Sequence, residues 1–135
     1  VGLPGERVDV AGLTVSVDGR PLPSEELGEV ELSPDAVDGV APEESRGLEL
    51  HVEQLGDRRH VVFVRRGVVQ APAGDLVPTD AVYLIGDNRS TGRGRDSRET
   101  GPTALSDVIG RPFCVLWSPR PGGGVRWDRM GAVWP

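Results

Sequence analysis

The residues best suited to chemistry lie in one polar segment, Gly86–Arg98. It holds two Asp, one Asn, two Ser and four Arg residues, and it has no apolar side chain. Carboxylates and guanidinium groups form forked ion pairs, and Asn side chains bond to nearby backbone groups. A long polar loop between core strands is usually functional or disordered, and one that satisfies its own polar groups favours order. The segment therefore predicts an ordered, site-forming loop.

Apolar runs on both sides of this segment are expected to hold it in place. Val82–Ile85 precedes it and Val108–Trp117 follows it, and short apolar runs of this kind are typical of buried strands. The only cysteine, Cys114, lies inside the second run. We therefore expect it to be a small buried hydrophobe rather than a nucleophile, and no intrachain disulfide can form.

The composition of the 135 residues favours short strands joined by turns. Gly (19) and Pro (12) are abundant, hydrophobic residues make up 37%, and few windows have a clean helical period. We expect an all-β, largely antiparallel fold, either one domain or a core with a small insert. The net charge of −6 argues against bulk attraction to nucleic acid or to anionic lipid. No stretch approaches the ~20 apolar residues of a membrane-spanning helix.

All 15 basic residues are arginine, and the chain contains no lysine. This chain alone therefore cannot perform a step that requires a neutral lysine amine. The two histidines, His51 and His60, could face each other across a hairpin, but two histidines do not complete a zinc site. The acidic residues of 23–47 also lack the fixed ligand spacing of a metal site. We expect no metal and no cofactor.

The first piece of chain, 1–22, reads as a compact β unit. Leu3–Glu6 places Pro and Gly at the centre of a type II turn. Residues 7–10 and 13–17 alternate like half-buried strands, and Asp18–Gly19 supplies a second tight turn.

The middle piece, 23–75, changes character. Its first part, 23–47, carries most of the acidic excess and little apolar material, which predicts a loop-rich or partly mobile segment. Leu48–Val52 and His60–Val64 then flank a turn at Gly56–Asp57, a pattern typical of a hairpin.

The third piece returns to strand, loop and strand, and 125–130 is expected to form one last short strand. The tryptophans are expected to pack in the core or at its edge: Trp117, Trp127 and Trp134. We expect a discontinuous core, 1–22 with 76–135, into which the loop-and-hairpin subdomain 23–75 is inserted.

Two motifs far apart in the sequence together resemble the type I signal peptidases. Val1–Glu6 is similar to the turn motif that follows the family's catalytic lysine. Gly86–Arg89 with Asp96–Arg98 is similar to the family's Gly-Asp-Asn-Arg loop closing on Asp-Ser-Arg. Further likenesses follow in matching order: Val77–Pro78, Gly101, Ile109–Arg111, Trp117–Pro119 and Arg126–Gly131. The resemblance spans the chain apart from its middle piece.

This resemblance implies a serine endopeptidase whose general base is a lysine. Family members sit on the outer, periplasmic face of the bacterial inner membrane, held by N-terminal helices, and cleave signal peptides from exported preproteins. A serine hydroxyl needs a nearby base, and a lysine serves when burial lowers its pKa. Both residues precede the Leu-Pro-Gly turn in the family. We therefore expect the catalytic pair and the membrane anchor upstream of Val1, and no peptidase activity from this chain alone.

By the resemblance, the residues in this chain support the active site rather than perform the chemistry. Asp96 and Arg98 would form an ion pair that braces the loop against the catalytic strands, with Ser97 between them. The tight backbone turn beside the lysine would be made by Gly86, Asp87 and Asn88.

The family also places a lysine-orienting serine shortly before Asp-Ser-Arg. Here the loop from Arg89 to Asp96 is two residues longer than the common form, and the aligned position is Ser90, Gly92 or Gly94. Only Ser90 has a hydroxyl, so it is the candidate for this role.

Other hypotheses stay open beside the active signal peptidase. One is a catalytically degenerate relative that binds peptides or partners without cleaving them. Another is a related processing peptidase from conjugation or organelle systems, for which a shorter insert is expected. A nucleic-acid module built on Gly92–Arg95 is disfavoured, because Arg/Gly segments bind nucleic acid as long repeats in a basic context. The polar segment could also be a connection that Asp–Arg pairs make rigid.

Overall fold

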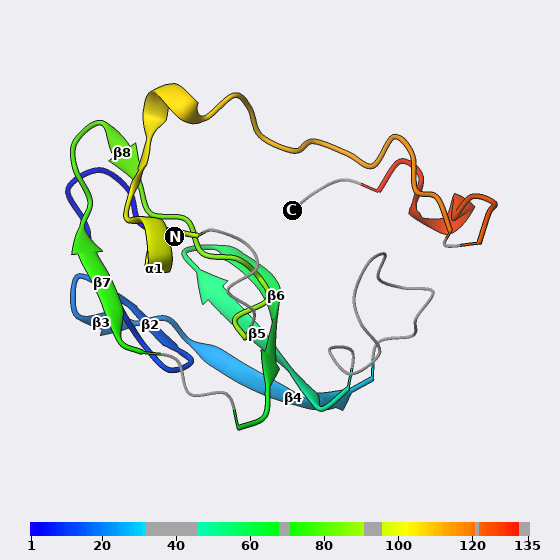
Figure 1. Ribbon diagram of the computed structural model, residues 1–135, viewed down its shortest axis with the longest axis horizontal. Helices are drawn as coiled ribbons and strands as arrows, with labels where there is room; N and C mark the ends of the chain where they lie inside the picture. Colours follow the sequence, from blue (N-terminus) through cyan, green and yellow to red (C-terminus); the bar gives the residue numbers. More distant parts are fainter. Residues whose placement is uncertain (32–45, 68–70, 91–95, 121, 133–135) are drawn as a thin grey trace.

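Strands dominate the computed structural model, which describes residues 1–31, 46–67, 71–90, 96–120 and 122–132. These residues contain nine short strands, one short α-helix and two 3-10 helices (Figure 1). Every strand pair within the sheets is antiparallel. The predicted all-β fold class is therefore confirmed.

The first sheet has four strands in the order β3-β2-β1-β7. They are β1 (Arg7–Ala11), β2 (Thr14–Val17), β3 (Arg20–Pro21) and β7 (Ala73–Leu76). Gly5 has a φ of 87°, as the third position of a type II turn requires, and Asp18 and Gly19 have positive φ of 51° and 73°. The predicted turns and hairpin of 1–22 are confirmed, although Leu13 lies in the turn before β2.

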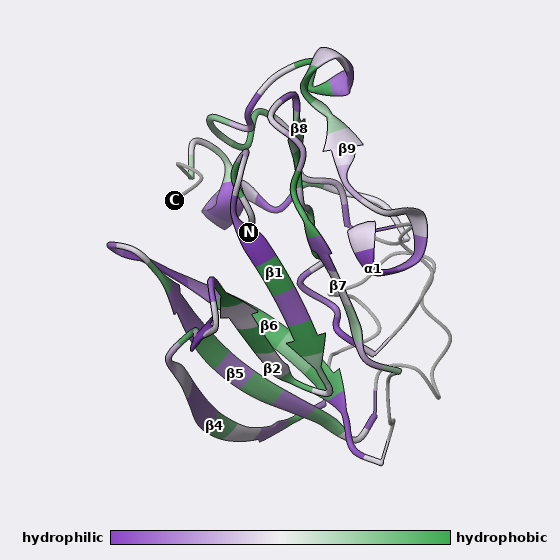
Figure 2. Cartoon of the chain, turned by 90° about the vertical axis from the view of Figure 1, so that its left-hand side faces the viewer, coloured by the Kyte–Doolittle hydropathy of each residue, from purple (hydrophilic) through white to green (hydrophobic). Residues whose placement is uncertain are grey.

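The apolar core lies against one face of this sheet. Apolar and polar residues alternate along β1, as Figure 2 shows in green and purple. The buried cluster joins β1 and β2 to the chain that leads into the polar segment: Val8, Val10, Val15, Val77, Ala81 and Tyr83. The segment 77–83, which leads into the predicted site, is therefore part of the core.

Gly2 lies against this core at a position where any side chain would be crowded. Its N–H donates to the Tyr83 carbonyl at 3.1 Å, and the Tyr83 N–H donates back at 2.9 Å. A Cβ at Gly2 would lie 2.4 Å from Cγ2 of Val8, which is closer than nonbonded carbons approach. The close passage fixes the first residues beside Tyr83.

The second sheet, in the order β4-β5-β6, comes entirely from the middle piece. Its strands are β4 (Ser24–Val30), β5 (Leu48–Leu55) and β6 (Arg58–Arg65). The β5–β6 hairpin and its turn at Gly56–Asp57 are confirmed, with longer strands than the pattern indicated. The register pairs His51 with Val62 and His60 with Glu53. The two histidines therefore share a face at diagonal positions, and the prediction that they face each other is wrong.

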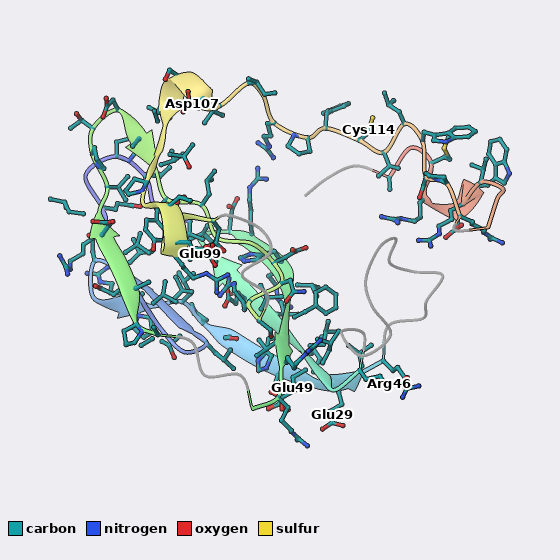
Figure 3. The ribbon with its side chains drawn as sticks, viewed as in Figure 1. Glu29, Arg46, Glu49, Glu99, Asp107 and Cys114 are labelled. Carbon is teal, nitrogen blue, oxygen red and sulfur yellow. The ribbon has the colours of Figure 1, made fainter. Side chains whose placement is uncertain are left out.

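The prediction of a loop-rich segment over 23–47 is wrong for β4, while 32–45 lie outside the described residues. β4 is an acidic strand at the edge of its sheet, and pairing brings its charges beside arginine. Arg66 lies 2.6 Å from Glu29 of β4 and 3.0 Å from Glu49 of β5; Figure 3 labels both glutamates. Ion pairs of this kind help a polar sequence form a strand that its composition disfavours.

Short elements hold the two ends of the polar segment. β8 (Ala81–Val82) pairs with β9 (Thr103–Ala104), and α1 (Ser97–Thr100) and η2 (Leu105–Asp107) flank β9 in the sequence. The predicted strand Val82–Ile85 is confirmed only in part. Its Val82 belongs to β8 and Tyr83 makes the bridge to Gly2, but Leu84 and Ile85 belong to no strand.

The predicted buried strand at Val108–Trp117 is wrong. None of the strands described here pairs with this segment, and Figure 1 shows it running away from both sheets. Phe113 is 77% exposed and Leu116 is 79% exposed, while Cys114 is half-buried on the same extended segment (Figure 3). An apolar run becomes a buried strand only when a second strand covers it.

The predicted last strand at 125–130 is also wrong, because the chain forms the 3-10 helix η3 (Trp127–Arg129) there. Gly122–Gly124 precede it with φ between 83° and 109°, a conformation that turns the chain rather than extending it. Trp117 and Trp127 are exposed, so the predicted tryptophan packing is wrong for both. Trp134 lies outside the described residues.

Gly2→Ala should destabilise the protein by about 1–3 kcal/mol, because the added methyl group overpacks the contact with Val8 and Tyr83. Gly110→Ala is the matched control, since nothing lies within 4 Å of its Cβ position and its φ is not positive. Urea unfolding of both variants measures the difference, and equal midpoints would contradict the close approach.

Candidate functional site

Asp96 and Arg98 form the predicted ion pair at the start of α1. The Arg98 Nε lies 3.0 Å from each carboxylate oxygen of Asp96, and Nη2 lies 2.6 Å from Oδ2. Asp96 is also the N-cap of α1, because its Oδ1 accepts the backbone N–H of Arg98 at 3.0 Å. The two side chains are 8% and 10% exposed. The pair is therefore shielded from water and has its hydrogen bonds in place.

The backbone of Gly86 is held from both sides by charged side chains. Its N–H donates to Oδ2 of Asp96 at 3.0 Å, and its carbonyl accepts from Nε of Arg89 at 3.1 Å. Arg98 connects the two sides of the turn, because its Nη1 donates to the carbonyl of Arg89 at 2.9 Å. The turn that follows Gly86 is thus fixed at both ends by side chains rather than by its own backbone.

A second buried ion pair, which the sequence analysis missed, anchors Arg89. Its Nη1 lies 2.9 Å from Oε1 of Glu53 on β5, and its Nη2 lies 2.5 Å from Oε2, so the two groups meet as a fork. Arg89 is 3% exposed and Glu53 is 2% exposed. The Nε2 of His60 lies 3.3 Å from Oε2 of Glu53 on the side that water reaches. The hairpin of the middle piece therefore contributes directly to the predicted site.

The turn itself lies along β6 as a short added strand. The N–H of Phe63 donates to the carbonyl of Asp87 at 2.9 Å, and the N–H of Arg89 donates to the carbonyl of Phe63 at 2.8 Å. These bonds make a parallel bridge between Phe63 and Asn88. The Oδ1 of Asp87 accepts the N–H of Asn88 at 2.8 Å, so this carboxylate shapes the turn from within.

The two serines of the segment bond to backbone rather than to a catalytic base. The Ser90 Oγ accepts the N–H of Arg65 in β6. Two hydrogen bonds join Ser97 to Leu84. The N–H of Ser97 donates to the carbonyl of Leu84 at 2.8 Å, and its Oγ accepts the N–H of Leu84 at 2.9 Å. Ser97 therefore fastens α1 to the chain between Tyr83 and Gly86.

The environment of Asp96 favours its charged form. Desolvation by burial, the largest single contribution, raises the pKa of Asp96. The hydrogen bond from the Arg98 guanidinium and those from the N–H groups of Gly86 and Arg98 outweigh it together, and they lower the pKa of Asp96 below its usual value. The carboxylate is thus ionised at neutral pH, as a brace for two backbone donors requires.

The arrangement can position backbone and exclude water, but its described groups do not form a nucleophile and base. The hydroxyl oxygens of Ser90 and Ser97 accept backbone N–H bonds, and the carboxylates are taken up by arginine and backbone donors. Among the residues that the structure describes, no group of three His, Cys, Asp or Glu side chains is placed to hold a metal ion.

The family of the chain follows from comparison with known proteins. Residues 1–117 match the family model described as signal peptidase, peptidase S26, a span well over half of the 135 residues. The chain belongs to the signal peptidase family, peptidase S26. The resemblance inferred from the sequence is confirmed, and the match includes both Val1–Glu6 and Asp96–Arg98. The comparison with curated proteins found no match.

Membership of the signal peptidase family indicates a serine peptidase of the signal peptidase kind. The two ion pairs and the turn between them therefore belong to a peptidase fold, and the Asp-Ser-Arg motif is the part of that fold at the start of α1. Within the described residues, no helix has the length and apolar character that crossing a membrane requires.

The sequence analysis missed Glu53 and Arg89 because neither residue stands out by pattern. Glu53 lies on the same face of β5 as Glu49 and His51, so the alternation of polar residues predicts that this face is exposed to solvent. Arg89 was noticed as part of the Gly-Asp-Asn-Arg motif, but a motif gives no partner 36 residues away. The face of the β5–β6 hairpin that carries two acids and two histidines also buries Val62 and Val64, and this combination is the only local hint.

Arg98→Ala should cost on the order of 3–5 kcal/mol, because it leaves the shielded Asp96 carboxylate without its counter-charge. Arg20→Ala removes a cation of the same kind from an exposed strand and is the control; its effect should stay within ~0.5 kcal/mol. Urea unfolding gives the two free energies, and limited proteolysis reports whether the turn loosens. Equal stability and equal protease resistance of both variants would contradict the bracing role.

The stabilisation by Asp96 should depend on pH. Since its folded pKa is lowered, its contribution is fully present above the unfolded value of about 3.9 and is lost as pH falls through the lower folded pKa. The difference in unfolding free energy between the parent and Asp96→Asn should therefore shrink when urea unfolding is repeated below about pH 4. A difference that is the same at neutral and acidic pH would show that the charge is not what matters.

Proposed function

We propose that this chain is the downstream part of the catalytic region of a membrane-anchored serine endopeptidase that cleaves signal peptides from exported preproteins. The serine nucleophile and the lysine general base would both lie upstream of Val1. Family membership supports the class of reaction. The observation that carries the proposal is that the first residues pair with Tyr83, directly beside the turn that the two ion pairs hold.

The pairing indicates where an upstream residue would lie. Gly2 pairs with Tyr83 as antiparallel strands do, with one backbone hydrogen bond in each direction between the two residues. In an antiparallel pair, each step back along one strand matches a step forward along the other. A strand continued upstream would therefore run past Ile85 toward Gly86. A lysine a few residues before Val1 would reach this turn, where partial burial lowers the pKa of an amine.

The residues in this chain would then act by holding that lysine in place. In this proposal the Asp96–Arg98 pair, with Ser97 between the two residues, braces the turn from the side of α1. The backbone beside the lysine is supplied by Gly86, Asp87 and Asn88. Ser90 is the proposed lysine-orienting hydroxyl, because an oxygen that accepts one bond from Arg65 still has its own hydrogen to donate.

The same proposal assigns a division of the chain and a place in the cell. Residues 1–22 and 76–135 would form the core and 23–75 an inserted subdomain. The separate β4-β5-β6 sheet supports this division, although β7 joins the core sheet from Ala73 onward. The parent protein would be anchored in the bacterial inner membrane by its upstream part, with the site on the periplasmic side and signal peptides as substrates.

The test is an assay on the parent protein with its upstream residues. It should cleave a signal-peptide substrate after a small residue, and replacing the upstream serine or lysine by alanine should abolish cleavage. Residues 1–135 alone should show no cleavage. Activity of 1–135 would refute the upstream placement. A folded parent without any cleavage would favour a degenerate, peptide-binding relative.

A further inference from the structure

Glu53 is the least exposed acidic side chain of the described residues, and it lies on the middle piece rather than on the core. Burying a carboxylate is costly unless a counter-charge and hydrogen bonds replace water. Arg89 supplies both through its fork, and the His60 ring lies against one of the oxygens. A buried ion pair is weak evidence for stability, since well-packed apolar residues often do as well. The burial of this ion pair therefore needs an explanation other than stability.

The geometry of the guanidinium gives that reason. The group is planar and rigid, so fixing two of its nitrogens fixes the direction of the third. Glu53 holds Nη1 and Nη2 of Arg89, and Nε is then directed at the carbonyl of Gly86, 3.1 Å away. The orientation of the Gly86 carbonyl thus depends on a carboxylate that belongs to the other sheet.

Backbone bonds from the same hairpin act on the same turn. Phe63 of β6 exchanges hydrogen bonds with Asp87 and Arg89, and the Arg65 N–H donates to Ser90 Oγ. The β5–β6 hairpin therefore holds one side of the turn through its backbone hydrogen bonds and through Glu53. The Asp96–Arg98 pair grips it from the other side.

We propose that Glu53 is a positioning residue for peptide cleavage: through Arg89 it orients the Gly86–Asn88 turn and so couples the inserted hairpin to the reaction. This rests on the proposed function, in which the upstream lysine lies beside that turn. Glu53 does not touch the substrate or the reacting atoms. Its effect is expected on the catalytic step rather than on substrate binding.

The test uses the parent enzyme with its upstream part and two kinds of variant. Glu53→Gln keeps the shape but removes the charge, and it carries the risk of misfolding because Arg89 is left buried and unpaired. The double variant Glu53→Met with Arg89→Met replaces the pair by apolar side chains of similar volume, which folded proteins often accept without loss of stability. Glu26→Gln removes an exposed acid from the same sheet and is the control.

We expect the double variant to keep the unfolding midpoint of the parent while kcat falls on the order of 10- to 100-fold and KM changes less than about threefold. Glu26→Gln should match the parent in all three. A stable double variant with the parent's kcat would overturn the proposal. So would a KM effect with an unchanged kcat, because it would place Glu53 in substrate binding.

Amide hydrogen exchange in the same variants separates this proposal from the proposed function. Loss of Glu53 should remove protection from the N–H groups of Gly86 and Arg89 while Val8 and Val10 in the core keep theirs. If the parent cleaves no signal peptide, the proposed function fails, but loss of protection still supports the positioning of the turn by Glu53. Unchanged protection at Gly86 and Arg89 overturns it whatever the activity.

Discussion

The hold of two buried ion pairs on the backbone of Gly86 is the constraint on which the rest of the site depends. Asp96 accepts the N–H of Gly86, and Arg89 donates to its carbonyl. Arg98 links the two pairs, because it donates to the carbonyl of Arg89. Shielded charges are stable only when their remaining donors and acceptors are also used. Here Asp96, Arg89 and Arg98 bond to backbone groups in or beside the turn, while Arg89 and His60 surround the Glu53 carboxylate. The buried charges therefore fix the position of the Gly86 backbone.

The two ion pairs come from different parts of the fold, so the site connects the core to the middle piece. Asp96–Arg98 belongs to α1, which Ser97 fastens to Leu84. Arg89 reaches across to Glu53 on β5, in a sheet that shares no strand with the core. The middle piece is therefore not a passive insert in this structure. Its hairpin supplies one buried charge and an edge strand, β6, on which the turn lies.

Strand pairing explains the contrast between the two ends of the described chain. At the first residues, Gly2 has no side chain, so the chain can pass close to Val8 and pair with Tyr83. In the run Val108–Trp117 the side chains are as apolar as those of a core strand, yet Phe113 and Leu116 are exposed. Apolar character provides the driving force for burial, but a strand forms only where a neighbour completes its hydrogen bonds and covers its face.

Local chemistry determined what the sequence by itself could reveal. The turns at Pro4–Gly5 and Asp18–Gly19 and the β5–β6 hairpin depend on residues close together in the chain, so their types and spacing were sufficient. The Asp96–Arg98 pair, also local, was predicted by the family resemblance. The strand β4, the exposed Val108–Trp117 run and the Glu53–Arg89 pair were decided by tertiary structure. An acidic residue in an alternating strand looks the same whether its side faces water or a distant arginine. Only the packing of β5 against the turn makes Glu53 a buried partner, because the free energy of a charge depends on what surrounds it in space.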